Sequence, residues 1–142
     1  MENIFEIKQG ELFSANAKEI VSAVVKILDS KKAGDIKVLK IDNKTIIADY
    51  FVICSGNSST QIRTLADEVE FQLSRGSVPY VKLEGTDSIE WKVVDCHDVI
   101  VHIFSNDARN FYNLEKLWAD AEEINIDDII SEEGKWSTSL IK

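Results

Sequence analysis

The chain has 142 residues, of which 44% are apolar and only one is proline, so it is long enough for one domain with a real core and is not rich in linkers. It carries 25 acidic and 16 basic residues, a net charge of −9, and residues 119–142 alone hold seven acids and two bases. No run approaches 18 consecutive apolar residues, and no lysine or arginine cluster could neutralise a phosphate backbone, so a membrane-spanning helix and direct nucleic-acid binding are not expected.

The two cysteines, Cys54 and Cys96, each lie in an apolar, strand-like run. This position favours buried free thiols over a disulfide or a metal pair. Reduced thiols are typical of the cytoplasm, so we expect a cytoplasmic protein.

An arm and a first helix open the chain. Residues 1–13 contain scattered apolar side chains without a clear period, so this arm could pack on the domain or on a neighbouring subunit. Ser14 is placed to cap a helix whose apolar residues recur at helical spacing, and Gly34 suits its exit. A strand is predicted over residues 36–41. Its lysines, Lys37 and Lys40, are expected to point towards solvent, which indicates a position near a sheet edge.

A buried strand and a second helix come next. Residues 49–55 are almost continuously apolar, as expected of a central strand that is covered on both faces. After a glycine, Ser58 and Gln61 form a Ser-x-x-Gln capping box. A second helix therefore begins here, and Gly76 ends it.

The second half of the chain predicts three strands, a helix and a tail. The strands cover residues 79–84, 89–95 and 99–104, and their connections are short enough for antiparallel hairpins. A third helix over residues 107–118 is expected to bury one apolar stripe, made of Phe111, Leu114 and Trp118. Residues 121–142 have the composition of an acidic, loosely held tail in which isoleucines could pack locally.

This order of elements predicts the fold class. We expect an α/β (α+β) fold in which helices pack on a mixed five-stranded sheet. The predicted single domain covers residues 14–120, between the N-terminal arm and the acidic tail.

The most enzyme-like feature is the turn from Ser55 to Ser58, between the central strand and the second helix. Backbone N–H groups at a helix N-terminus can bind an anion, and nucleotidyltransferases place a Gly-Ser turn in a similar context. Such enzymes also need adjacent carboxylates on a following strand, which hold two divalent ions about 4 Å apart. The acids after this turn lie instead on the predicted second helix or at opposite ends of a hairpin turn; they are Asp67, Glu68, Glu70, Asp95 and Asp98. We therefore expect no catalytic residues and no cofactor.

The histidines do not predict a metal site. Cys96 and His97 are adjacent in a turn, and no second Cys/His cluster accompanies them. His102 lies in the middle of an apolar strand, where a core histidine is more common than a ligand.

Two features could serve binding. Trp91 shares a strand face with Asp95, and Arg109, Tyr112 and Glu115 fall outside the buried stripe of the third helix. Mixed aromatic and charged groups of this kind resemble interface anchors. The alternative is a core tryptophan and an ordinary solvated helix face, and composition alone favours it.

Taken in order, several segments resemble the ribosomal silencing factor family, which is also called Iojap-like. They follow the family's order and spacing over about residues 15–120, and they are Ala48–Ser59 with Gln61, Glu84–Gly85, Glu90–Asp95, Asp98–Phe104, Arg109–Tyr112 and Leu114–Trp118. The arm and the residues after Trp118 lie outside the resemblance.

The resemblance implies a nucleotidyltransferase-like domain that lacks the catalytic carboxylates. It also implies a protein that is not an enzyme and that docks on large-subunit ribosomal protein L-fourteen at the intersubunit face. There it would keep the small subunit from joining and so repress translation when nutrients are scarce. A homodimer off the ribosome is implied as well.

An acidic protein that binds the ribosome is expected to contact a basic ribosomal protein rather than RNA phosphates. Our hypothesis assigns the partner-binding residues as two aromatic anchors, Trp91 and Tyr112, and three carboxylates that face lysine or arginine, Glu84, Asp95 and Glu115. Arg109 would orient a carboxylate or contact the partner directly. Two alternatives stay open: a metal-dependent nucleotidyltransferase that uses the Ser55–Ser58 turn, and a homodimeric scaffold for another basic partner.

Overall fold

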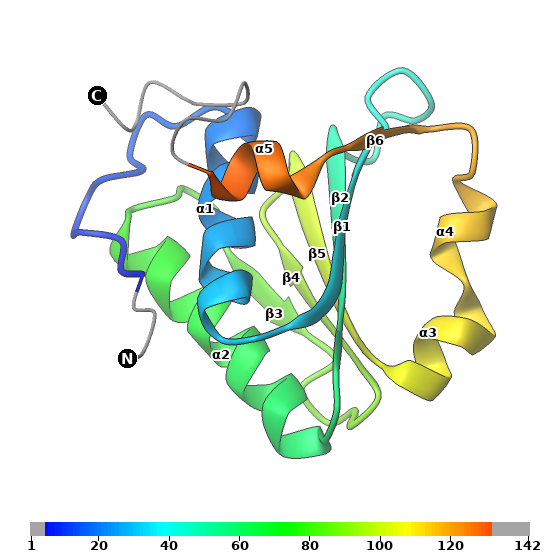
Figure 1. The fold of residues 1–142 in the computed structure, drawn as a ribbon. Helices are drawn as coiled ribbons and strands as arrows, with labels where there is room; N and C mark the ends of the chain where they lie inside the picture. Colours follow the sequence, from blue (N-terminus) through cyan, green and yellow to red (C-terminus); the bar gives the residue numbers. More distant parts are fainter. Residues whose placement is uncertain (1–4, 132–142) are drawn as a thin grey trace.

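A mixed β-sheet runs through the middle of the computed structural model, which describes residues 5–131 (Figure 1). Its strands in the described part are β1 Gly34–Lys40, β2 Tyr50–Gly56, β3 Lys82–Glu84, β4 Trp91–Asp95, β5 Val99–Ser105 and β6 Glu122–Ile124. They are ordered β3-β4-β5-β2-β1-β6, with β2 and β5 parallel and the other neighbours antiparallel. The predicted mixed α+β fold and its hairpins are confirmed, and the sheet has a sixth strand beyond the five that were predicted.

Helices pack on both sides of this sheet. Their bounds along residues 5–131 are α1 Ala17–Ser30, α2 Ser59–Arg75, α3 Asn106–Tyr112, α4 Leu114–Leu117 and α5 Ile126–Ile130. α1, α2 and α5 lie on one side, and α3 and α4 lie on the other (Figure 1). None of the helices in the described range is long and apolar enough to cross a membrane.

The first helix is capped by Asn16 and not, as predicted, by Ser14. The Asn16 side chain accepts a hydrogen bond from the Glu19 backbone N–H at 2.8 Å, and the Glu19 carboxylate accepts from the Asn16 N–H at 3.0 Å. This reciprocal capping box satisfies two donors at once. Ser14 has Ala17 three residues ahead, which cannot return the bond.

The predicted start of the second helix is confirmed. The Ser58 hydroxyl accepts from the Gln61 backbone N–H at 3.1 Å, and Gly76 is the C-cap. Just before the Ser58 cap, a Cβ atom at Gly56 would lie only 2.8 Å from a side-chain carbon of Ile62. A glycine at this position therefore lets the end of β2 approach α2 closely.

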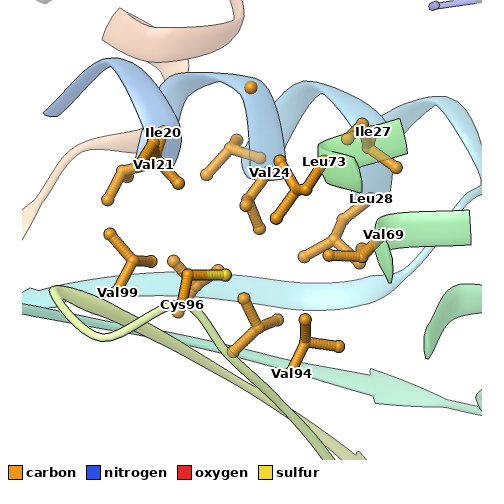
Figure 2. Close-up of a cluster of buried hydrophobic side chains, with 14 of the residues drawn as sticks. Ile20, Val21, Val24, Ile27, Leu28, Val69, Leu73, Val94, Cys96 and Val99 are labelled. Carbon is orange, nitrogen blue, oxygen red and sulfur yellow. The ribbon is translucent and has the colours of Figure 1, made fainter. Parts of the chain in front are cut away.

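The larger core lies between the sheet and the helices α1, α2 and α5. Aliphatic side chains of α1 and α2 meet side chains of the sheet and its turns there, among them Val21, Val24, Leu28, Val69, Leu73, Val94 and Val99 (Figure 2). Both cysteines are buried and free, as predicted. Burial raises the pKa of the Cys54 and Cys96 thiols to about 12, so both stay protonated near neutral pH.

The described part of the N-terminal arm packs on its own domain. Ile7 and Leu12 are buried in the larger core. The Gln72 side chain holds the arm in place, because its oxygen accepts from the Ile7 backbone N–H at 2.7 Å and its nitrogen donates to the Phe5 carbonyl at 3.0 Å.

The region after α4 is more ordered than the predicted loose tail. β6 pairs with β1, placing Ile124 opposite Val38, and Ile129 of α5 is buried against the larger core. The loose attachment predicted for residues 121–131 is therefore wrong, because the backbone of β1 offers a pairing edge that acidic composition does not reveal. The expected packing of the isoleucines is confirmed, since Ile124, Ile126, Ile129 and Ile130 lie against the larger core. Residues 132–142 of the predicted tail lie outside the described residues.

Candidate functional site

The sheet face opposite α1 and α2 is only partly covered, and we call it the open face. Side chains alternate along a strand, so the register places Trp91, Val93 and Asp95 on this face, beside Glu84 of β3 and His102 of β5. α3 and α4 cover this face around β2 (Figure 1). The residues buried there form a smaller core, made of Leu39, Ile41, Ala48, Phe51, Ile53, Phe104 and Ala108. The side chains of β3 and β4 on the open face are exposed or half-buried.

Three contacting aromatic side chains form what we call the aromatic patch: Trp91, Tyr112 and Phe111. The ring centroids of Trp91 and Tyr112 lie 4.7 Å apart, and those of Tyr112 and Phe111 lie 5.0 Å apart. Trp91 also stacks on the buried Phe104 at 4.9 Å. Tyr112 is 51% exposed and Phe111 is 79% exposed. The patch therefore joins a strand to a helix and presents large apolar groups to solvent.

The predicted third helix is broken at Asn113, whose backbone is left-handed with φ of +50°. Asparagine tolerates this conformation better than most residues, and it ends α3 as a cap. Because the helical phase is interrupted, Phe111 is exposed, and its predicted place in the buried stripe is wrong. Leu114 and Trp118 do pack against the smaller core.

Arg109 is buried, so its predicted outward position is also wrong. Its Nε and Nη2 atoms donate to the Glu115 carboxylate at 2.9 and 3.2 Å, and its Nη1 donates to the Ser55 hydroxyl at 2.8 Å. Asp35 lies 3.6 Å from the guanidinium and Lys37 lies 3.6 Å from the Glu115 carboxylate. Arg109 thus ties α3 to β2 and α4, and it orients a carboxylate, which was one of the two roles considered for it.

Glu115 is the acidic partner in this network. The hydrogen bond from Arg109 lowers the pKa of the Glu115 carboxyl, and the charges of Arg109 and Lys37 add to this effect, while partial burial opposes it. The carboxylate is therefore ionised in the folded chain near neutral pH, and its strongest bonds lie within the protein.

Glu84 and Asp95 lie near the two ends of the β3–β4 hairpin on the open face. Glu84 is exposed, and its carboxylate lies 3.6 Å from the ammonium of Lys82. The Asp95 carboxylate accepts from the His97 backbone N–H at 2.9 Å, which closes the turn between β4 and β5. Both acids lie on the same face as Trp91, together with Lys82, which directly opposes Asp95.

The turn that follows Glu84 is fixed by a buried lysine. The Lys92 ammonium donates to the backbone carbonyls of Gly85 and Thr86 at 3.2 and 2.8 Å. Gly85 has φ of +73°, and a Cβ atom there would lie 2.7 Å from the Trp91 carbonyl oxygen. Glycine is therefore required at this point, and the turn holds the start of β4, including Trp91, in place.

His102 is buried, as predicted for a core histidine. Its Nδ1 accepts a hydrogen bond from the Trp91 indole N–H at 3.2 Å, and its Nε2 has no hydrogen-bond partner in residues 5–131. Burial lowers the pKa of His102 to about 4, so the ring is neutral near neutral pH. The sequence hypothesis missed the hydrogen bond between His102 and Trp91. The strand register could have indicated it, because His102 opposes Val93, and Trp91 lies two residues before Val93 on the same face of β4.

The predicted anion-binding turn lines a separate cavity of about 450 Å³ at the start of α2. Its acidic lining residues are Glu90 and Asp107. Asp67, Glu68 and Glu70 lie on α2, as predicted, and not on a strand. Within the described residues, no group of three or more histidines, cysteines or carboxylates is arranged to hold a metal ion.

Comparison with known proteins identifies the family. A family model described as "Ribosomal silencing factor during starvation" matches residues 14–140 of this chain. The chain belongs to this family. Since the match reaches residue 140, the expectation that the residues after Trp118 lie outside the resemblance is wrong, while the resemblance itself is confirmed.

Two bacterial members of the family match this chain along most of their length. A ribosomal silencing factor from Bacillus subtilis is 41% identical over 112 residues, which cover 79% of this chain and 95% of that protein. One from Halalkalibacterium halodurans is 37% identical, over 80% of this chain and 97% of that protein. A crystal structure of a protein from Chromobacterium violaceum superposes with a TM-score of 0.71 at 32% identity, covering 73% of this chain and 87% of that one. Family membership indicates a regulatory role at the ribosome.

Proposed function

We propose that this protein binds the large ribosomal subunit through ribosomal protein L-fourteen and blocks association with the small subunit, which represses translation under nutrient limitation. The observation that carries the proposal is the open face, which holds the aromatic patch together with the carboxylates of Glu84 and Asp95. Family membership supplies the ribosome as the partner, and the chemistry of the face favours a basic protein as the contact.

The aromatic patch provides the anchors of the proposed interface. Large aromatic side chains bind strongly because they bury much apolar surface at a small cost in side-chain entropy. Trp91 is already ordered by Phe104 and Tyr112, so little further ordering is needed on binding. Tyr112 and Phe111 extend the same surface onto α3.

The charged residues of the hypothesis divide into two groups. Glu84 and Asp95 remain candidates to face lysine or arginine on the partner. Glu115 and Arg109 bind each other, so we propose that they hold α3 and α4 in the shape that the partner recognises. Reversing the charge of Glu115 would place a cation beside the buried Arg109 and break its two shortest contacts to a carboxylate, so Glu84→Lys is the cleaner test of charge at the interface.

We further propose that the protein acts in the cytoplasm and is a homodimer off the ribosome. An exposed aromatic patch marks an interaction site, and the same patch of a second copy is a suitable apolar partner for it. Sedimentation equilibrium of the full chain tests this: a dimer is expected, which Tyr112→Ala weakens, and a strict monomer at micromolar concentration contradicts it.

The function is tested by sedimenting separated ribosomal subunits through a sucrose gradient, with and without the protein. We expect the protein to travel with large subunits and the joined particle to decrease. The proposal fails if the protein stays at the top of the gradient while the subunits join normally.

The cavity at the start of α2 favours one second candidate, a metal-dependent nucleotidyltransferase that uses the Ser55–Ser58 turn. Backbone donors at a helix N-terminus suit a phosphate, whereas the arrangement of carboxylates does not suit two metal ions. Calorimetry with ATP and magnesium separates the candidates. Clear binding followed by turnover supports the enzyme, and no heat of binding supports the non-enzymatic regulator.

A further inference from the structure

The Trp91 side chain is fixed by a hydrogen bond to the neighbouring strand β5, in addition to its contacts with other aromatic rings. Its indole N–H donates to His102 Nδ1 at 3.2 Å, and the centroids of the two rings lie 5.9 Å apart. Because the indole N–H is used within the protein, the exposed part of Trp91 offers ring surface and no hydrogen-bond donor.

His102 lies beneath this contact with only 7% of its surface exposed. The ring of Phe51 meets it edge-on, with centroids 4.7 Å apart. Since Nδ1 accepts from Trp91, the neutral ring carries its proton on Nε2, and this buried atom has no hydrogen-bond partner in the described part of the chain. A buried polar atom without a partner opposes folding, so an apolar side chain would serve packing better. The bond to Trp91 is the contact that accounts for a histidine here.

We propose that His102 is a positioning residue for partner binding, which accepts the Trp91 indole N–H so that Trp91 presents only its ring surface to the partner. This inference rests on the proposed function, because it takes the aromatic patch as the docking surface. The hydrogen bond to His102 also indicates which kind of side chain on the partner Trp91 contacts. On a face that also carries Glu84 and Asp95, an indole surface suits a lysine or arginine side chain that stacks on the ring, rather than a hydrogen-bond acceptor.

A double-mutant cycle tests the proposal. Trp91→Phe removes the N–H and keeps an aromatic ring, and His102→Leu removes the acceptor. Each change is expected to weaken binding of the full chain to large subunits about 2- to 10-fold, because a looser ring must be ordered on binding. The double variant should bind no more weakly than the weaker single variant, since both changes break the same bond. Losses that multiply would overturn the role of His102.

The indole N–H resonance of Trp91 gives a second readout that does not depend on the ribosome. It is assigned in the ¹H–¹⁵N spectrum by its loss in Trp91→Phe. In His102→Leu it should move towards the position of a solvent-exposed indole and exchange faster with water; an unchanged resonance overturns the proposal. If His102→Leu does not fold, His102→Phe keeps a ring without an acceptor and takes its place.

Trp91→Ala separates the failure of this inference from the failure of the proposed docking surface. If Trp91→Ala binds large subunits as tightly as the unmodified chain, the docking surface is wrong, and the role of His102 falls with it. The other outcome is that Trp91→Ala binds weakly while the double variant loses affinity by the product of the two single losses. In that case the docking surface stands and only the role of His102 is wrong.

Discussion

The two faces of the sheet differ in the helices that pack on them and in the side chains that these helices bury. One face is closed by α1, α2 and α5 over aliphatic side chains, and the other is covered around β2 and exposed around β3 and β4. The partly covered face holds aromatic rings, the buried Arg109 and the buried His102, whose Nε2 has no hydrogen-bond partner in residues 5–131. The side closed by α1 and α2 buries polar groups as well, among them Gln72 of α2 and Lys92 of β4, but both donate hydrogen bonds to backbone carbonyls. The exposed aromatic rings, together with a buried His102 Nε2 that lacks such a bond within the described residues, therefore indicate that the exposed part of the open face is shaped for a partner.

The largest expected effect on stability belongs to the closed face. Leu73 is fully buried between α2 and the sheet, so Leu73→Ala should lower the free energy of unfolding by about 2–5 kcal/mol, through lost contacts and a cavity. Phe111→Ala, in the aromatic patch, should change it by no more than about 0.5 kcal/mol. Urea denaturation measures both. Equal losses would mean that the open face is part of the stabilising core.

Breaking the Arg109 network should have the next largest effect. Arg109→Met removes the donor to the buried Ser55 hydroxyl and leaves Lys37, 3.6 Å away, as the cation beside the Glu115 carboxylate, and we expect a loss of about 2–4 kcal/mol in the free energy of unfolding. Adding Glu115→Gln to this variant should restore part of the loss, since the half-buried charge that has lost the hydrogen bonds of Arg109 is removed. A loss below about 0.5 kcal/mol for Arg109→Met would contradict the structural role of this network.

His102 predicts how stability depends on pH. Its pKa is about 4 in the folded chain and about 6.5 in a model peptide, so the unfolded chain binds more protons between these values. The free energy of unfolding should therefore fall as pH decreases from 6.5 towards 4, with a contribution from His102 of up to about 3 kcal/mol. The decline between pH 6.5 and 5 should become flatter in His102→Leu. The same slope in both proteins would show that His102 is not the group responsible.

The smallest expected effect is at the ion pair between Lys44 and Asp120, whose side-chain atoms lie 3.2 Å apart between the β1–β2 loop and the chain after α4. Asp120 is largely exposed, so solvent and salt screen the attraction. Lys44→Ala should change the free energy of unfolding by less than about 0.5 kcal/mol, at low and at high salt alike. A larger loss at low salt would show that this pair helps to hold α4 over the sheet.

Features set by local chemistry could be predicted from the sequence. The apolar run of β2, the Ser58 cap of α2 and the short connections of the hairpins each depend on neighbouring residues, and all three are confirmed. The family resemblance depended on the order of such segments, and it is confirmed as well.

Features set by distant contacts could not be predicted. Arg109 is buried because the Ser55 hydroxyl, which is far away in the sequence, accepts one of its N–H groups. β6 forms because β1 leaves an edge free. The turn at Asn113 is an intermediate case: asparagine is a known signal for a left-handed residue, but the helical spacing of the apolar residues favoured an unbroken helix.

Binding of one pair of variants to large subunits tests the docking surface most directly. Trp91 is on the open face, and Phe71, which is 59% exposed on α2, is a matched aromatic residue on the opposite side. Trp91→Ala should weaken binding about 30-fold or more, as expected of a central anchor, while Phe71→Ala should stay within about 2-fold of the unmodified chain. Equal affinities for the two variants, with both shown to be folded by circular dichroism, would contradict the assignment of the open face as the surface that binds the ribosome.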